Sequence, residues 1–483
     1  MSLTAALRTA SAALALNAAQ SAIVSRNVSN AGDASASAKI AQTVGAADGS
    51  ARRLVTTRAA DAALGAARLT ANAEAASATA RSDGLAGLGA IMGEPGDSSS
   101  PGALLAALGS ALQTYAATPA SQTAGAAAIA AASRLAEGLN AATRTIQDLR
   151  TQTDARMAAS VGTINKLLAD FDRSDAAVVR GLATGADVTD AQDARDAILK
   201  SLSGEIGVIT VARADGSLAI YADGGATLAD RGARAVSFSP TTLAAGAGGA
   251  AIHVDGVAVT GPGASMPIRS GALAGLAALR DEAAPRLQAQ LDEVSRGLVE
   301  AFSERDSSGA ARPGLFTWSG APASPSTPSP GLAGSIAVSA AADPARGGAV
   351  SLLRDGGING TAFASNAGGA ASYSARLQGL ADALDATRAF DPGAGLGASA
   401  SLLAYANDAM GALQAARSDA DGRAASAATL AAQAATALSD ATGVNLDAEM
   451  SHMLDLENAF QASAKLIAAA NSMFAVLFNA VQA

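Results

Sequence analysis

Few side chains in this sequence have the types and spacing that chemistry requires. Asp193 and Asp196 flank Arg195 on one predicted helix, and two carboxylates can act as general acid and base. The two histidines, His253 and His452, are far apart in the sequence, and there is no cysteine. Because no histidine, thiol or metal-ligand pattern accompanies the carboxylates, we interpret them as a surface ion-pair cluster rather than a catalytic site.

Motifs for cofactors and other ligands are missing as well. The sequence has no P-loop, HExxH or nucleophile-elbow spacing. A net charge of −9 without a basic block argues against nucleic-acid binding. No apolar run reaches the roughly 18 residues of a membrane span, and polar residues interrupt the N-terminal segment too often for a cleaved signal peptide. We expect no catalytic residues, no cofactor, no metal, no nucleic acid and no membrane span.

The two ends of the chain carry matching apolar patterns. The N-terminal seam contains Leu3, Leu7, Leu14, Asn17, Val24 and Val28, and the C-terminal seam contains Phe460, Ile467, Asn471, Phe474 and Phe478. With Ala10, Ser21 and Ala464 included, the positions step by threes and fours. Such a narrow seam is typical of a coiled coil, and one asparagine in each favours a fixed register. We expect the termini to pair with each other and to stay mobile in the isolated subunit. The alternative is two unrelated surface helices docked on a globular core.

Between the ends, the sequence predicts long alanine-rich helices interrupted by β hairpins. Hydrophobic residues make up 49% of the chain and aromatic residues only 3%, which favours thin helical bundles over one wide core. Helices are expected over 51–92 and 187–202, the latter with Thr189 as a cap. Asp255-Gly256 is expected to form a hairpin turn, and Pro285 to lie at a helix boundary or kink.

These elements give an elongated fold that is mainly α with β inserts. The expected organisation is a terminal coiled-coil domain (1–40 and 441–483), a helical rod domain (41–202, 266–310 and 373–440), a β-hairpin insert (203–265) and a small β-rich or loop-rich outer region (311–372).

Four stretches of the sequence resemble a known family. They are 190–203, with Arg195 and Asp196; 270–298, with Gly271, Gly275, Leu276, Arg280 and Asp281; 443–449, with Gly443, Asn445, Leu446 and Asp447; and 164–168. In these stretches the chain is similar to the first hook-associated protein of bacterial flagella, which joins hook to filament. The chain departs from the family after Gly32, where Asp33-Ala34-Ser35 replaces an aromatic residue and a basic pair.

The resemblance implies a structural protein of the extracellular flagellum at the hook–filament junction. It implies export through a type III channel without a cleaved signal peptide. The implied partners are further copies of the chain in a ring, the hook protein, the second junction protein, and a cytoplasmic export chaperone at the C-terminal helix. The alternatives are another axial protein, such as the second junction protein or flagellin, which the 270–302 signature disfavours, and a secreted enzyme or effector.

Overall fold

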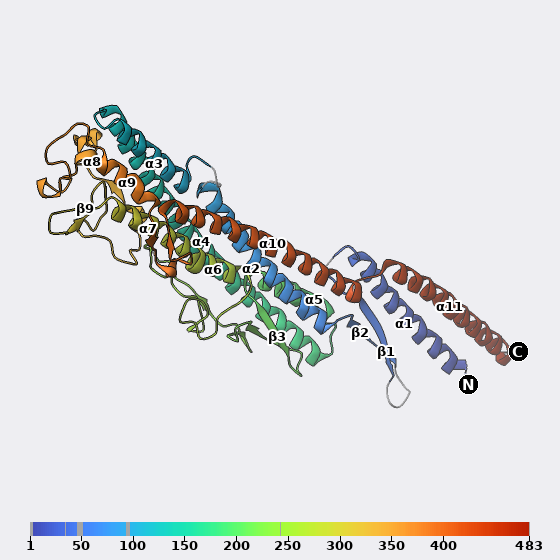
Figure 1. The fold of residues 1–483 in the computed structure, drawn as a ribbon. Coiled ribbons are helices and arrows are strands. Elements are labelled where there is room, and N and C mark those ends of the chain that lie inside the picture. The colour runs from blue at the N-terminus through green and yellow to red at the C-terminus, as the bar shows by residue number, and fades with distance from the viewer. Residues whose placement is uncertain (1–2, 34, 46–51, 93–96, 242, 483) are drawn as a thin grey trace.

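Long helices run along one axis of an elongated molecule (Figure 1). The computed structural model describes residues 3–33, 35–45, 52–92, 97–241 and 243–482. Helices α1 (Leu3–Asn30) and α11 (Leu446–Gln482) pack together at one end of the molecule, where both termini lie. The predicted pairing of the terminal helices is therefore confirmed, and so is the mainly α fold with small antiparallel sheets.

The remaining helices form a rod. They are α2 (Ala62–Met92), α3 (Pro101–Ala117), α4 (Gln122–Thr184), α5 (Thr189–Glu205), α6 (Ala272–Ala278), α7 (Ala284–Ala301), α8 (Ser351–Asp355), α9 (Ala375–Asp385) and α10 (Leu402–Thr442). With 63 residues, α4 is about 95 Å long and sets the length of the rod. Local signals fix its ends: the Ser121 side chain accepts a hydrogen bond from the Ala124 N–H, and Gly185 ends the helix in the left-handed conformation, with φ 69°.

Two apolar clusters stabilise the rod. One joins α3, α7, α9 and the first halves of α4 and α10, and it includes the fully buried Leu135 and Leu298. The other joins α2, the second half of α4, α5, α6 and the neighbouring strands, around Ile164 and Ile220. Neither cluster contains a described residue of α1 or α11. The apolar core of the rod therefore ends before the terminal pair.

A π-helical turn, η1 (Leu279–Ala283), separates α6 from α7. Pro285 follows it in the first turn of α7, and the carbonyl of Arg280, five residues earlier, accepts a hydrogen bond from Arg150 Nε at 3.2 Å. The prediction that Pro285 lies at a boundary is confirmed. Short 3-10 turns occur at Leu332–Gly334, Pro344–Arg346, Thr361–Phe363 and Pro392–Ala394.

The strands form small antiparallel sheets. They are β1 (Lys39–Gly45), β2 (Arg52–Arg58), β3 (Val208–Ala212), β4 (Leu218–Ala222), β5 (Thr227–Ala229), β6 (Val236–Ser237), β7 (His253–Val254), β8 (Val257–Ala258), β9 (Glu304–Arg305), β10 (Ala311–Arg312), β11 (Phe316–Thr317), β12 (Ala337–Val338), β13 (Arg388–Ala389) and β14 (Ser399–Ala400). The three-stranded sheets are β3-β4-β5 and β6-β7-β8, and the others are pairs. Asp255 and Gly256 both have positive φ, 49° and 80°, as the hairpin turn between β7 and β8 requires.

Two local predictions are wrong. The helix expected from residue 51 begins at Ala62, because the β-branched run before it forms strand β2. Thr189 does not cap α5 with its side chain. It is the first helical residue, and Asp187 Oδ1 accepts hydrogen bonds from its N–H at 2.9 Å and its hydroxyl at 2.7 Å.

Candidate assembly surface and its joint to the rod

One side of the terminal pair is buried. Leu456, Ser463 and Ala470 on α11 are 6%, 8% and 4% exposed, and Ala10 and Val24 are buried on α1. The three α11 residues are spaced by seven, which is the heptad spacing of a coiled coil. They define the contact line of α11 within one subunit.

The predicted seam residues of α11 do not lie on this contact line, although two of them flank it. On α1, Val24 is buried and Leu7, Leu14, Asn17 and Val28 are half-buried; on α11, Ile467 and Phe474 are half-buried and Phe460, Asn471 and Phe478 are exposed. The Leu3 side chain lies outside the described part of the chain. The role of these residues in assembly stays a prediction.

Large apolar side chains are exposed along α11. We use the name α11 apolar face for these side chains together, which are distributed around the helix; they are Leu446, Met450, Leu454, Phe460, Leu466, Met473, Val476, Leu477 and Phe478, and they are 45–67% exposed. An exposed apolar surface of this extent marks an interaction site.

The same segment qualifies the expectation that the chain has no membrane span. By length and composition alone, Leu402–Ala480 contains a window apolar enough to cross a membrane, and 11% of that window is buried. This is weak evidence for a span, because a helix whose apolar face is covered by another protein meets the same criterion.

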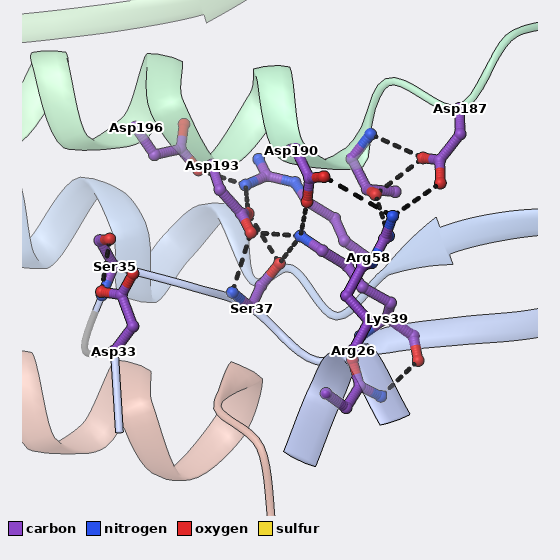
Figure 2. Close-up of polar contacts among 12 residues, drawn as sticks. Arg26, Asp33, Ser35, Ser37, Lys39, Arg58, Asp187, Asp190, Asp193 and Asp196 are labelled. Atoms are coloured by element: carbon purple, nitrogen blue, oxygen red, sulfur yellow. Dashed lines mark hydrogen bonds and ion pairs between the residues drawn. The ribbon is translucent and has the colours of Figure 1, made fainter. Parts of the chain in front are cut away.

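The joint between the terminal pair and the rod is polar (Figure 2). At its centre, Asp193 of α5 accepts hydrogen bonds from Lys39 Nζ, from the Ser37 N–H at 3.0 Å and hydroxyl at 2.7 Å, and from Arg58 at 3.0 Å. Arg58 also binds Asp196 at 2.6 Å. The Lys39 side chain is only 1% exposed, so its charge depends on these partners. Both strands of the β1–β2 hairpin are thereby attached to α5.

Helix α1 joins the same region through two neighbouring residues. Arg26 donates to Asp187 at 3.3 Å and to the Thr189 hydroxyl at 2.8 Å. Asn27, 2% exposed, exchanges two 2.9 Å hydrogen bonds with the Lys39 backbone and donates to Glu449 of α11 at 2.8 Å. One buried asparagine thus connects α1, β1 and α11.

The electrostatics of the joint favour the ionised carboxylates. Burial alone would raise the pKa of Asp193, but hydrogen bonds from Lys39, Ser37 and Arg58 outweigh it and hold the pKa below its usual value. The pKa of Asp187 is lowered in the same way, where the hydrogen bonds of Thr189 and Arg26 outweigh burial. Asp187 and Asp193 are therefore ionised at neutral pH.

The predicted surface ion-pair cluster on α5 is wrong in its partners. Residues one or two positions apart on a helix do not face each other, so Arg195 points away from Asp193 and Asp196. Arg195 instead binds Asp175 at 2.7 Å and the Gly216 carbonyl at 2.9 Å. Sequence reasoning missed Lys39, Arg58, Arg26 and Asn27, because their partners lie on distant segments and no short motif marks them.

The glycines of the 270–298 stretch, which resembles the flagellar family, allow close packing. Gly271 precedes α6 with φ 87°, and a Cβ there would lie 2.5 Å from the Ile206 Cα. A Cβ on Gly275 would lie 2.3 Å from the Ser77 carbonyl oxygen, so this glycine lets α6 approach α2. Leu276 beside it belongs to the second apolar cluster.

Arg280 of the same motif is fully buried. It pairs with Asp154 and with Asp281, at 2.8 Å, and donates to the Ala250 carbonyl at 2.8 Å. Arg280 thereby fastens the loop before β7 to the π turn and α4.

The 443–449 stretch, which also resembles the family, lies at the start of α11. Asn445 Oδ1 accepts from the Ala448 N–H at 3.1 Å, as a helix cap does. A Cβ on Gly443 would lie 2.5 Å from the Ser439 carbonyl oxygen, which explains the glycine at the end of α10. Leu446 and Asp447 follow, exposed in the first turn of α11.

A cavity of about 840 Å³ lies beside the joint. Its lining includes Arg58, Arg68 and Thr210, together with residues from the end of α10. Arg68 Nε is buried, and within the described part of the chain it has no hydrogen-bond partner. Burial lowers the pKa of Arg68, which nearby Asp196 partly opposes. Among the described residues, no cluster of histidine, cysteine or acidic side chains could hold a metal ion.

These features define an elongated, mainly helical structural protein with exposed apolar side chains on its last helix. In sequence comparison, the model described as "Flagellar hook-associated protein FlgK helical domain" matches residues 85–315, and "Flagellar basal body rod FlgEFG protein C-terminal" matches residues 439–480. The helical part of this chain, residues 85–315, therefore belongs to the family of the flagellar hook-associated protein FlgK, a family of structural flagellar proteins.

Other comparisons are less extensive. No curated protein matches the chain significantly. A solved structure titled "The structure of the flagellar hook junction protein FlgK from Burkholderia pseudomallei" is 21% identical in sequence, with a TM-score of 0.42. The match covers 52% of this chain and 46% of that one, so the chain spans about half the length of this solved relative. The family assignment therefore rests on the two sequence models.

Proposed function

We propose that this chain is a structural subunit of the junction between hook and filament, where it forms a ring with further copies. The observation that carries the proposal is the α11 apolar face. Nine large apolar side chains exposed on one terminal helix would be unfavourable in water, and neighbouring subunits in a tube would cover them.

The proposed partners follow from this position in the flagellum. One end of the ring would contact the hook protein and the other the second junction protein. Before export, a cytoplasmic chaperone would cover the C-terminal helix, and the chain would then pass through the type III channel without losing a signal peptide. The resemblance in sequence and the exposed α11 apolar face support these assignments.

Deletion of the gene in a flagellated host tests the proposal. The deletion strain should make hooks without filaments and release monomeric flagellin into the medium, and the wild-type chain should restore filaments. The variant Val476→Asp, at an α11 position that is 67% exposed, should not restore filaments, and the amount of variant chain in the medium separates failed assembly from failed export. Met266→Asp, 39% exposed in the loop between β8 and α6, is the matched control and should restore them. Normal filaments in the deletion strain would contradict the proposed function.

A further inference from the structure

Strand β3 has an open edge. It is the outer strand of the β3-β4-β5 sheet, and the bond from the Arg213 N–H to the Ser217 carbonyl, at 2.9 Å, fixes its pairing with β4. In this register the odd-numbered residues, such as Val211, exchange hydrogen bonds with β4. Thr210 and Ala212 therefore direct their N–H and C=O groups to the opposite side. No hydrogen bond given by the described residues uses these outward groups.

The β3 edge lacks the features that protect edge strands from pairing. The strand Val208–Ala212 contains no charged residue and no proline, and its pairing with β4 has no bulge. Ile209 and Val211 are 52% and 49% exposed, and Ala212 is exposed as well. An uncharged, accessible edge of this kind is a template for a strand from another chain.

Strand β2 has a second open edge. The bond from the Ala59 N–H to the Ala38 carbonyl, at 2.8 Å, fixes the pairing of β1 with β2. Leu54 and Thr56 then direct their backbone groups away from β1, and no hydrogen bond given by the described residues uses them. The opposite edge of the hairpin lies against α1. A two-stranded hairpin gains stability when a further strand is added.

We propose that the outer edge of β2 in one copy pairs with the open edge of β3 in the next copy. The inference rests on the proposed function, since it describes how axial subunits contact one another. Two different edges on one chain make a head-to-tail contact, which propagates from copy to copy. Both edges lie at the joint end of the rod, because Arg58 at the end of β2 and Thr210 of β3 line the same cavity. Within one chain the two strands are not paired.

Cross-linking in assembled flagella tests the pairing directly. The chain has no native cysteine, so Thr56→Cys and Thr210→Cys can be made in separate full-length copies and co-expressed in the deletion strain. A short bis-maleimide should link them into a dimer only when both variants are present. Thr56→Cys with Ser399→Cys, an exposed position on β14, is the control pair and should give no dimer.

The outcome separates this inference from the proposed function. If the cysteine variants restore filaments but give no Thr56–Thr210 dimer, the edge pairing is overturned and the junction function stands. If filaments form without any copy of the chain, the junction function fails first.

Proline substitution tests the backbone groups themselves. Thr210→Pro removes an outward N–H and leaves the bonds to β4 intact, whereas Thr210→Val retains that N–H. The proline variant should lose filament assembly with an unchanged monomer melting temperature, and the valine variant should assemble. Thr56→Pro and Thr56→Val repeat the comparison on the other edge and cover the case in which one proline variant fails to fold. Normal assembly of a folded proline variant would overturn the pairing.

Discussion

Replacement of Lys39 by methionine should weaken the joint without weakening the rod. Removing one partner of a buried ion pair costs about 3–5 kcal/mol when the other charge is left uncompensated. Here Asp193 keeps Arg58 at 3.0 Å and two hydrogen bonds from Ser37, and its side chain is 12% exposed. We therefore expect a cost of about 2–3 kcal/mol, below the full penalty for an uncompensated charge.

Hydrogen exchange measures this cost where it should appear. The amides of β1 and β2 should lose protection in Lys39→Met, while those of α4 in the rod should keep it. Lys200→Met is the matched control, because Lys200 is exposed on α5 and makes no ion pair among those found in the described residues. In a double-mutant cycle with Asp193→Asn, the coupling energy should reach about 1 kcal/mol or more.

Two results would refute this reasoning. A cost for Lys39→Met within about 0.5 kcal/mol of the Lys200→Met cost would mean that the Lys39 charge is not buried against Asp193. Equal loss of protection in the hairpin and in α4 would mean that the joint unfolds together with the rod.

Three further predictions concern the joint, the terminal helix and the rod. The folded pKa of Asp193 lies below its unfolded value of about 3.9, so the stability that this carboxylate contributes is complete above about pH 3.9 and is lost as the pH falls through the folded pKa. Hydrogen-exchange protection of the β1–β2 hairpin should therefore fall below about pH 4. Asp193→Asn should remove this fall in protection. Phe474→Asp should block filament assembly while lowering the free energy of monomer unfolding by less than the about 3–5 kcal/mol of a lost core Phe; a full core-sized loss, measured by thermal unfolding, would favour a docked helix instead. Arg280→Met should lower the free energy of unfolding by about 3–5 kcal/mol, since it leaves Asp154 buried and unpaired, and Asp154→Leu in the same chain should recover part of the loss; no recovery in denaturant titrations would count against the pair.

The main elements could be predicted because their signals are local. The three-and-four spacing at each end predicts two seam helices, and the Asp255-Gly256 pair predicts a turn with two positive φ angles. Pro285 also carries a local signal: because proline has no N–H to donate within a helix, it predicts a helix boundary or kink at its own position. The start of α2 was misplaced because alanine favours helix in the sequence, whereas the short β-branched run before it pairs with β1.

The joint could not be predicted because its partners are distant in the chain. Lys39 and Asp193 are 154 residues apart, and Asn27 and Glu449 are 422 apart. Charge spacing along one helix instead suggested that Arg195 pairs with its neighbours, although they point in different directions. Only the packing of the hairpin against α5 decides which lysine or arginine faces Asp193.

The polar nature of the joint has a consequence for the unassembled subunit. If apolar contacts attached the terminal pair to the rod, each opening of the joint would expose a second apolar, aggregation-prone surface beside the α11 apolar face. Opening this joint instead exposes Lys39, Arg58 and Asp193, which water solvates readily. The subunit can thus change the position of its terminal pair without adding apolar surface, and the α11 apolar face remains the main surface that a partner must cover.

A chaperone on the C-terminal helix would cover the α11 apolar face before export, and neighbouring copies would cover it after assembly. Val476→Asp, which makes that face less apolar, should therefore weaken chaperone binding as well as filament formation, and unchanged affinity in a titration with the purified chaperone would separate the two surfaces.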